Sequence, residues 1–383
     1  MKKIDCLKKN ECTGCYCCKN ICPVNAITLV EDEEGFLYPK IDSKKCINCG
    51  LCYKSCPSIN KINYNKINDS YIAVSKKDSI ISTSGGIFPL LANYVLNLDG
   101  YVCGAIIDEN NTIKHVVSND INVINKMRGS KYTQSIIDNV YIEIRNLLNS
   151  NKYCLFTGTP CQVAGLKKFL KSENDKLICV DLICHGVSNQ KFLKEDIKRK
   201  YNNALLVGFR QKNKFEGSTY KMKLIDNGKI INKYYYEDAY YNSFMKAYSF
   251  RESCYNCLYS ISKRVGDITI GDSSCYLNNK QFKYDNSVSL VLINTKKGKD
   301  IFNNIKSNLK FDSTFLEQEI LNNEQLHKPS NRPLERNNIF NDLKLLDYNS
   351  FEKKYTEKLS CVDIIKRDFK RLIPQKIKRA IKK

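Results

Sequence analysis

The sequence has no tryptophan, only three histidines and no run of eighteen apolar residues. The missing apolar run predicts that no helix crosses a membrane. The N-terminal segment MKKIDCLKKNEC lacks an apolar h-region, which argues against a signal peptide and for a cytoplasmic protein. No aromatic-rich RNA motif or recognition helix accompanies the basic residues, so nucleic acid is not an expected partner.

Basic residues and cysteines are both in excess. The 62 Lys and Arg residues outnumber the 40 Asp and Glu residues, which gives a net charge of +22. Such a charge suggests an acidic partner, although the lysine-rich composition of an AT-rich genome explains it as well. Nineteen cysteines are too many for an ordinary cytosolic chain of 383 residues. Without a signal peptide they indicate metal ligands, not disulfides.

Two cysteine runs with one spacing, Cys-x2-Cys-x2-Cys-x3-Cys-Pro, occupy the first sixty residues. In this bacterial-ferredoxin pattern, three cysteines of one run and the last cysteine of the other bind each [4Fe-4S] cluster. We therefore assign to a first cluster Cys12, Cys15, Cys18 and Cys56, and to a second cluster Cys46, Cys49, Cys52 and Cys22. Structural zinc is the alternative, but zinc ribbons use two CxxC pairs. Gly14 and Gly50 are expected to let backbone N–H groups approach the sulfurs, and Cys17 is not an expected ligand.

Beyond residue 70, short β-rich runs alternate with helical patterns. Strands are expected to begin near residues 71, 101, 153, 177, 267 and 288, and helices are expected near 86–98, 136–150, 161–172, 191–200 and 297–307. This alternation predicts an α+β or mixed α/β body behind a small ferredoxin-like domain. The expected domains are a ferredoxin domain at 1–60, a linker at 61–70, two body regions at 71–150 and 151–330, and a polar segment with a basic C-terminal helix at 331–383.

Four further cysteines lie at the ends of expected strands and helices. Cys161 opens a helix, with Thr159 as the expected N-cap and Pro160 at the first helical position, so the helix dipole is expected to lower the pKa of its thiol. Cys184 ends a strand, and Cys254 and Cys257 form a CxxC pair. The favoured interpretation is a third [4Fe-4S] cluster. A redox-active CxxC disulfide, zinc and inert buried cysteines are the alternatives.

Six motifs in a fixed order resemble one known family. They are Ser84-Gly85-Gly86, Arg128-Gly129-Ser130-Lys131-Tyr132, Gly158-Thr159-Pro160-Cys161, Asp181-Leu182-Ile183-Cys184-His185-Gly186, Ser253-Cys254-Tyr255-Asn256-Cys257 and Asp267-Ile268-Thr269-Ile270-Gly271-Asp272. Over about residues 70–330 the chain is similar to the beta subunits of coenzyme F420-reducing hydrogenase and F420-dependent formate dehydrogenase. The resemblance implies bound FAD, a cluster on the body cysteines, and electron exchange with F420 or another soluble redox partner or catalytic subunit.

One departure concerns the pocket of this family. Its members often have Phe-Trp after the last Gly-Asp, whereas Ser273-Ser274-Cys275 follows Asp272 here. If the aromatic pair shapes a substrate or flavin pocket, the pocket of this chain differs, which bears on whether F420 is used.

Several residues of the six motifs are candidates for binding FAD or for catalysis. Ser84, Gly85 and Gly86 form a turn that enters a helix, where N–H groups hold a pyrophosphate or the turn is merely a cap. The loop of Gly129, Ser130, Lys131 and Tyr132 offers a cation for phosphate and an aromatic ring for the isoalloxazine, or is a surface loop. Asp267 and Asp272 bind ribose or cap turns, and His185 donates a proton, hydrogen-bonds a cluster sulfur or is structural. The remaining cofactor-binding candidates are Gly158 and Thr159.

The C-terminal segment 361–383 is a basic amphipathic pattern, with Lys or Arg at nine of the last eighteen positions. It predicts peripheral contact with the anionic inner face of a membrane, or a solvated docking helix. For the whole chain we expect an iron–sulfur flavoprotein oxidoreductase. A non-catalytic electron-transfer subunit and a reductase in cell-surface polysaccharide biosynthesis are the alternatives.

Overall fold

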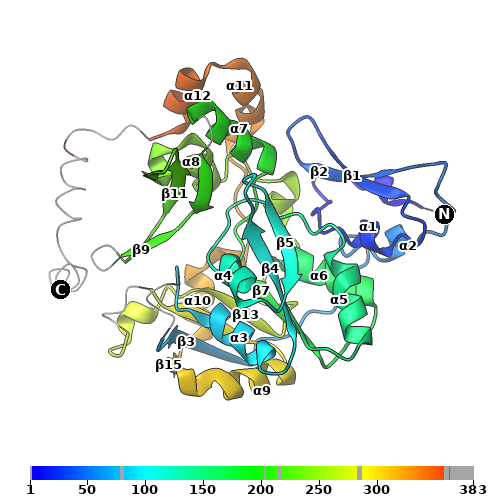
Figure 1. Ribbon diagram of the computed structural model, residues 1–383, viewed down its shortest axis with the longest axis vertical. Coiled ribbons are helices and arrows are strands. Elements are labelled where there is room, and N and C mark those ends of the chain that lie inside the picture. Colours follow the sequence, from blue (N-terminus) through cyan, green and yellow to red (C-terminus); the bar gives the residue numbers. More distant parts are fainter. Residues whose placement is uncertain are drawn as a thin grey trace.

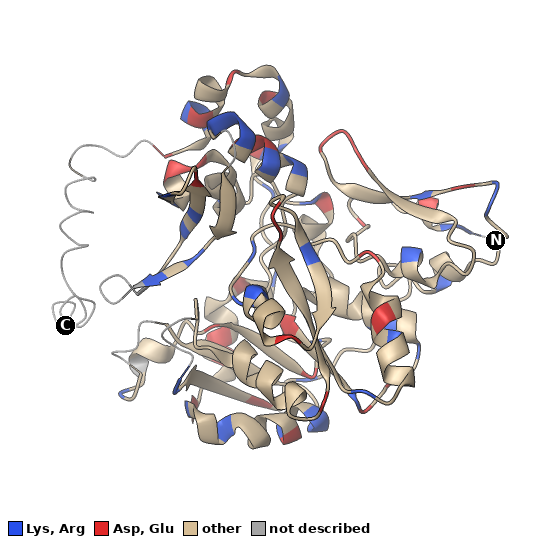
Figure 2. Cartoon of the chain, viewed as in Figure 1, with Lys and Arg blue, Asp and Glu red and all other residues tan. Residues whose placement is uncertain are grey.

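The computed structural model describes residues 2–77, 82–201, 204–213, 217–282, 287–357 and 362. The predicted basic helix at 361–383 therefore lies, apart from Val362, outside the described residues. Within them, no helix combines the length and apolar character needed to cross a membrane. The chain forms a small N-terminal part, a large body built on one sheet, and a smaller lobe (Figure 1). Figure 2 shows Lys and Arg on all three parts, interspersed with Asp and Glu.

The body contains an eight-stranded mixed sheet with strand order β15-β3-β14-β13-β7-β6-β4-β5. The central strands β4, β6, β7 and β13 are parallel, and the strands on either side pair antiparallel. The bounds are β3 Asp69–Ser75, β4 Tyr101–Ile107, β5 Ile113–Ser118, β6 Cys154–Gly158, β7 Leu177–Leu182, β13 Ile268–Asp272, β14 Ser289–Ile293 and β15 Leu309–Ser313. Because β6 and β7 are parallel neighbours, the loops after them begin side by side.

Helices cover both faces of this sheet. One face carries α5 (Val140–Asn149) and α6 (Pro160–Leu170), and the other carries α3 (Ile87–Leu96), α4 (Ile121–Met127) and α9 (Lys296–Ile305). Successive side chains of a strand point to opposite faces, so Cys154 and Phe156 join the core under α5 and α6, and Leu155 joins the core under α3, α4 and α9. The predicted mixed α/β body behind a ferredoxin-like domain is confirmed, and Cys103, Cys154 and Cys179 are core residues as expected.

The smaller lobe is built on a three-stranded antiparallel sheet of order β12-β11-β8. Its strands are β8 Leu205–Gly208, β11 Lys221–Asp226 and β12 Lys229–Tyr234, next to a hairpin of β9 Gln211–Asn213 and β10 Gly217–Thr219. Its helices are α7 Gln190–Lys200, α8 Ala239–Met245, α11 Ile339–Leu345 and α12 Tyr348–Tyr355. The segment after residue 330, expected to be polar, contributes Ile339, Phe340 and Phe351 to the core of this lobe.

Short helices complete the described chain. Helix α10 spans Leu316–Asn322. The 3-10 helices of the body and lobe are η3 Tyr235–Glu237, η4 Glu252–Asn256, η5 Tyr276–Asn278, η6 Lys306–Asn308, η7 Glu324–Leu326 and η8 Leu334–Asn337. The N-terminal part consists of η1 Ile4–Cys6, α1 Cys17–Ile21, β1 Ile27–Glu31, β2 Leu37–Ile41 and α2 Leu51–Lys54.

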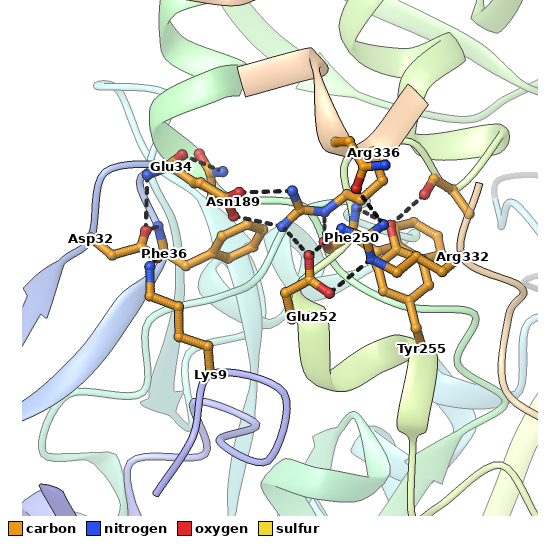
Figure 3. Close-up of polar contacts among 12 residues, drawn as sticks. Lys9, Asp32, Glu34, Phe36, Asn189, Phe250, Glu252, Tyr255, Arg332 and Arg336 are labelled. Atoms are coloured by element: carbon orange, nitrogen blue, oxygen red, sulfur yellow. Dashed lines mark hydrogen bonds and ion pairs between the residues drawn. The ribbon is translucent and has the colours of Figure 1, made fainter. Parts of the chain in front are cut away.

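The N-terminal part is docked on the body and the smaller lobe. Phe36, at the tip of the β1–β2 hairpin, is only 1% exposed and packs edge-to-face on Phe340 of the lobe with ring centroids 5.7 Å apart. Beside it, the Glu34 carboxylate accepts two hydrogen bonds from the Arg336 guanidinium, and its carbonyl oxygen accepts one from Asn189 (Figure 3). The predicted linker is also held, since Asn65 pairs with Arg264. The N-terminal part is therefore fixed at both ends.

Candidate iron–sulfur and cofactor sites

The two N-terminal cysteine loops have the same backbone path. Positive φ angles occur at matching positions, 64° at Gly14 and 64° at Tyr16 in the first loop, and 54° at Asn48 and 70° at Gly50 in the second. This left-handed conformation is natural for glycine and unusual for tyrosine, so Tyr16, 4% exposed, is held in it by its packing. Gly14 and Gly50 were expected to let backbone N–H groups approach the sulfurs. No local pattern indicated that Tyr16 and Asn48 share their conformation.

The four cysteines predicted for the first cluster lie together and are buried. Their exposed fractions are 7% for Cys12, 8% for Cys15, 9% for Cys18 and 6% for Cys56. Burial raises the pKa of the Cys18 thiol well above its ordinary value, and the nearby Cys12 and Cys56 thiols raise it further. Cys56 comes from the other run, as the ferredoxin pattern predicts. Hydrogen bonds from the backbone of Ser58 and Ile59 reach its sulfur.

The second set lies closer to the surface. Burial raises the pKa of Cys52, and the neighbouring Cys49 and Cys22 thiols add to this effect. Cys22 therefore lies with the second run, and its sulfur accepts a hydrogen bond of 3.2 Å from the backbone N–H of Ala26. Cys46, like these three, is partly exposed. In the structure, Cys22 of the first run thus lies with the second set, and Cys56 of the second run lies with the first set. That all eight thiols are cluster ligands stays a prediction.

Four body cysteines from three separate segments also converge. Burial raises the pKa of Cys184 well above the ordinary thiol value, and three nearby thiols, those of Cys254, Cys161 and Cys257, raise it further. Burial raises the pKa of Cys254 to about 12, again with the Cys257 and Cys161 thiols as neighbours. A metal or cluster bound here would deprotonate such thiols and reverse this cost.

Sheet topology and one glycine bring these segments together. Cys161 follows β6 and Cys184 follows β7, so the two lie at the same edge of the sheet. Cys254 belongs to η4 and Cys257 follows it directly. Gly186 has a φ of 146°, and a Cβ atom there would lie 2.3 Å from the ring of Phe250. Only glycine lets the loop after β7 approach the loop before η4 this closely.

The helix that carries Cys161 begins as predicted, but the thiol does not behave as predicted. Thr159 is the N-cap and Pro160 the first residue of α6, and the Gln162 side chain accepts a hydrogen bond of 3.0 Å from the Thr159 N–H. The expectation of a lowered pKa at Cys161 is wrong. Burial raises its pKa to about 11 and outweighs the opposing effect of the hydrogen bond between the thiol and the Thr159 hydroxyl.

Buried hydroxyl groups next to these cysteines fit bound clusters. Among the described residues, the side-chain oxygens of Thr13, Ser253 and Tyr259 are buried and have no protein hydrogen-bond partner. Thr13 follows Cys12 and Ser253 precedes Cys254. Tyr259 lies near Cys15 and Cys161. An unpaired buried hydroxyl is costly, and cluster sulfur would accept its hydrogen bond. No group of three His, Cys, Asp or Glu side chains within the described ranges is arranged to hold a single metal ion.

Some of the residues that are candidates for binding FAD also lie together. The Arg128 guanidinium donates to the Ser82 hydroxyl at 3.1 Å, which places the loop after α4 against the Ser/Gly turn. Arg210 forms an ion pair of 2.7 Å with Asp272, and Tyr132 lies beside both. Lys212 donates to the Ser84 carbonyl oxygen at 3.5 Å. The sequence interpretation missed Arg210 and Lys212, since neither belongs to a motif.

The structure gives other candidates structural contacts. The Gly85 N–H donates to the Ser289 hydroxyl, and Gly86, with a φ of 80°, is the N-cap of α3. The Lys131 ammonium group donates to three carbonyl oxygens at the end of α4, and burial lowers its pKa to about 7. Asp267 accepts hydrogen bonds from the Cys179 N–H and the Thr295 hydroxyl.

The last candidates differ in exposure. His185 is exposed, and partial desolvation lowers its pKa while the Asp272 and Glu324 carboxylates oppose this shift. Gly158, in contrast, is buried at the end of β6, and a Cβ atom there would lie 3.0 Å from the Gln162 side chain and from the Phe156 ring. The roles of both residues stay predictions.

Models of known families match both the segment with the N-terminal cysteines and the segment with the four body cysteines. Residues 11–60 and 38–84 match models of 4Fe-4S dicluster domains. Residues 151–318, which contain all four body cysteines, match the model of the C terminus of the coenzyme F420 hydrogenase/dehydrogenase beta subunit. This segment is therefore similar to the C-terminal part of that beta subunit. The resemblance noted in the sequence is thereby confirmed, together with the iron–sulfur character of the N-terminal domain.

Individual relatives of the beta-subunit segment and of the dicluster domain are distant or short. One subunit of the F(420)H(2) dehydrogenase of Methanosarcina mazei is 23% identical over 220 residues, which are 53% of this chain and 63% of that protein. One subunit of the Na(+)-translocating ferredoxin:NAD(+) oxidoreductase complex of Acetobacterium woodii is 44% identical over 46 residues, 12% of this chain and 13% of that protein. The chain thus spans less than two thirds of either relative.

One solved structure is similar over much of the chain. The F420-reducing [NiFe] hydrogenase complex from Methanosarcina barkeri, studied by xenon derivatization, contains a chain with a TM-score of 0.46 and 18% identity. The match covers 76% of this chain and 93% of that one.

Proposed function

We propose that this protein is an iron–sulfur flavoprotein oxidoreductase in which electrons pass between the N-terminal clusters, a third [4Fe-4S] cluster in the body, and FAD. The convergence of the partly exposed Cys161, Cys184, Cys254 and Cys257 at one place supports the third cluster. Four thiols of this kind match the ligand set of a cubane, and neighbouring hydroxyl groups offer hydrogen bonds to its sulfurs.

The proposed order of electron transfer follows from exposure and contact. The second cysteine set is partly exposed and suits exchange with an external carrier, whereas the first set is buried. The Cys15 loop packs against α5 and α6. The Cys15 carbonyl oxygen accepts a hydrogen bond of 2.8 Å from the hydroxyl of Tyr141 on α5. Gly165 lies four residues after Cys161 on α6, and a Cβ atom there would be 3.0 Å from the Cys15 Cβ. The first cluster would therefore be the neighbour of the body cluster.

The FAD part of the proposal rests on a smaller set of contacts. Bound FAD would convert one-electron transfer from the clusters into a two-electron hydride exchange. Ser84, Lys212 and Arg128 could bind its phosphates, and Tyr132 could lie against its ring system. F420 is one candidate partner for the hydride, because the Methanosarcina mazei relative is named an F(420)H(2) dehydrogenase subunit.

A second candidate function is an electron-transfer subunit that is inactive alone. Both relatives are named as subunits, which favours this possibility. Turnover of F420, NADH or reduced ferredoxin by the isolated protein would support an oxidoreductase that is active alone. No turnover by the isolated protein, together with turnover by a purified complex, would support an electron-transfer subunit.

The decisive experiment is anaerobic purification with iron, sulfide and flavin counted. We expect about twelve irons and one flavin per chain, and about eight irons in Cys161→Ser because a cubane lacking one thiolate is lost or degraded. Cys154→Ala is the matched control, since this cysteine is buried at the start of β6 whereas Cys161 follows the end of that strand, and it should keep about twelve irons. About eight irons in the unmodified protein would exclude the third cluster, and a protein without flavin would exclude the FAD part.

A further inference from the structure

Arg251 is completely buried where the N-terminal part meets the body. Its Nε donates to the carbonyl oxygen of Cys12 at 2.7 Å, and its Nη2 donates to the carbonyl oxygen of Leu37 at 3.0 Å and to the Cys12 sulfur at 3.5 Å. Its Nη1 donates to the Gln134 side chain at 3.2 Å. The guanidinium also stacks over the Tyr38 ring, 4.1 Å from the centroid. One side chain thus joins the first cysteine loop to the body.

The same guanidinium lies close to the body cysteines. Its charge acts to lower the pKa values of the Cys161 and Cys254 thiols, although burial raises both overall. The Arg251 carbonyl oxygen accepts a hydrogen bond of 2.8 Å from the Cys254 N–H. Arg251 therefore lies between the first N-terminal set and the body set.

What distinguishes Arg251 is its lack of a carboxylate partner. Three arginines of the described residues are almost fully buried, and two of them are paired: Arg264 with Asp181, and Arg336 with Glu34 and Glu252 (Figure 3). Within the described chain, Arg251 forms no ion pair, and all its hydrogen-bond acceptors are neutral groups or the Cys12 thiol. A buried charge without a counter-charge is strongly destabilising.

We propose that Arg251 is the counter-charge of the clusters at this junction: it positions the Cys12 loop and makes the first cluster easier to reduce. This inference rests on the proposed binding of clusters by these cysteines. A [4Fe-4S] cluster with four thiolates carries a charge of about −2 when oxidised and one more negative charge when reduced. The nearby guanidinium favours the added electron, and its N–H···S bond to Cys12 acts in the same direction.

The test compares three variants of the full-length holoprotein. Arg251→Gln removes the charge, Arg251→Lys keeps it without the planar fork, and Arg332→Gln is the control. Arg332 also contacts the η4 segment, through an ion pair with Glu252, but its side chain is 37% exposed and its hydrogen bonds reach Glu252 and Asn337. We measure three quantities for each variant: the iron content, the midpoint potential from a redox titration followed by electron paramagnetic resonance, and the hydrogen exchange of residues 12–18. A Cys15→Ser sample identifies the signal of the first cluster.

We expect Arg251→Gln to lower the midpoint potential of the first cluster, so that the ratio of reduced to oxidised cluster at a fixed potential falls about tenfold. For a one-electron couple this corresponds to about 59 mV. Arg251→Lys should keep a potential near that of the unmodified protein while hydrogen exchange of the Cys12 loop increases. Arg332→Gln should change neither quantity.

An unchanged potential in Arg251→Gln with full iron content, or equal shifts in Arg251→Gln and Arg332→Gln, would overturn the inference. If Arg251→Gln loses the first cluster, Arg251→Lys decides: a retained potential supports the role of the charge, and a fall as large as tenfold contradicts it. Failure of the third cluster would show separately, in the iron count of the unmodified protein.

Discussion

Truncating Phe36 tests whether the N-terminal part is fixed to the smaller lobe. Its ring lies at the tip of the β1–β2 hairpin and is almost fully buried against Phe340 of the lobe, in a cluster that also contains Phe192. An aromatic side chain buries at least about 150 Å², which at about 25 cal/mol per Å² contributes about 4 kcal/mol. Phe→Ala substitutions in cores cost about 3–5 kcal/mol, in agreement with this value. We therefore expect Phe36→Ala to destabilise docking of the hairpin by about 4 kcal/mol.

Hydrogen exchange of the holoprotein, read by mass spectrometry over residues 27–41, measures this effect. A loss of about 4 kcal/mol in opening free energy raises exchange by roughly three orders of magnitude, since each 1.4 kcal/mol is a factor of about ten. Val30→Ala is the matched control on the same hairpin, because Val30 is 44% exposed, and it should change exchange by less than about threefold.

A rise of less than tenfold in Phe36→Ala, or one equal to that of Val30→Ala, would refute the reasoning. It would mean that the polar contacts of Glu34 with Arg336 and Asn189 dock the hairpin without help from the aromatic ring. Unchanged iron content in the variant is required for this comparison, because loss of a cluster would itself increase exchange.

Two further predictions concern the body. Gly165→Ala places a methyl group about 3.0 Å from the Cys15 Cβ and the Tyr141 hydroxyl, so we expect a destabilisation of about 1–3 kcal/mol and an altered electron paramagnetic resonance signal of the first cluster; an unchanged melting temperature and signal would contradict the close approach. Burial lowers the pKa of His115 to about 4, below its ordinary value of 6.5, so the unfolded chain binds more protons between these values and stability falls as pH decreases through them. Between pH 7 and 5.5 this group should cost about 1 kcal/mol, and His115→Gln should remove that part of the pH dependence in anaerobic denaturant titrations; an identical pH dependence in the variant would show that His115 is not the source.

Motif spacing predicted which N-terminal cysteines lie together, because cluster ligation imposes a strict local pattern. Cys22 lies with the second run and Cys56 with the first, as this spacing predicts. The proximity of Cys161 and Cys184 agrees instead with their expected positions at the ends of strands and helices. The predicted helices at 161–172 and 191–200 correspond to α6 and α7, since capping residues and apolar periodicity are local properties. The C-terminal prediction falls on residues outside the described ranges.

Properties that depend on burial could not be predicted in this way. The helix dipole at Cys161 was anticipated, but desolvation by burial, which raises the pKa of this thiol, was not. Lys131 was a candidate for phosphate, yet its ammonium group caps α4. Tertiary contacts decide both cases, because a motif does not reveal which chain segments cover it.

By itself, the sequence determined the kinds of site that this protein contains: two ferredoxin-type cysteine runs, a further cysteine set, and an alternating body with a segment similar to the beta subunit. Only the tertiary structure decided how these parts are joined. Phe36 enters the core of the lobe, Gly165 admits the Cys15 loop, and Arg251 lies uncompensated between two groups of thiols. Ligand spacing is written in neighbouring residues, whereas the position of a buried charge follows from packing between residues more than two hundred positions apart.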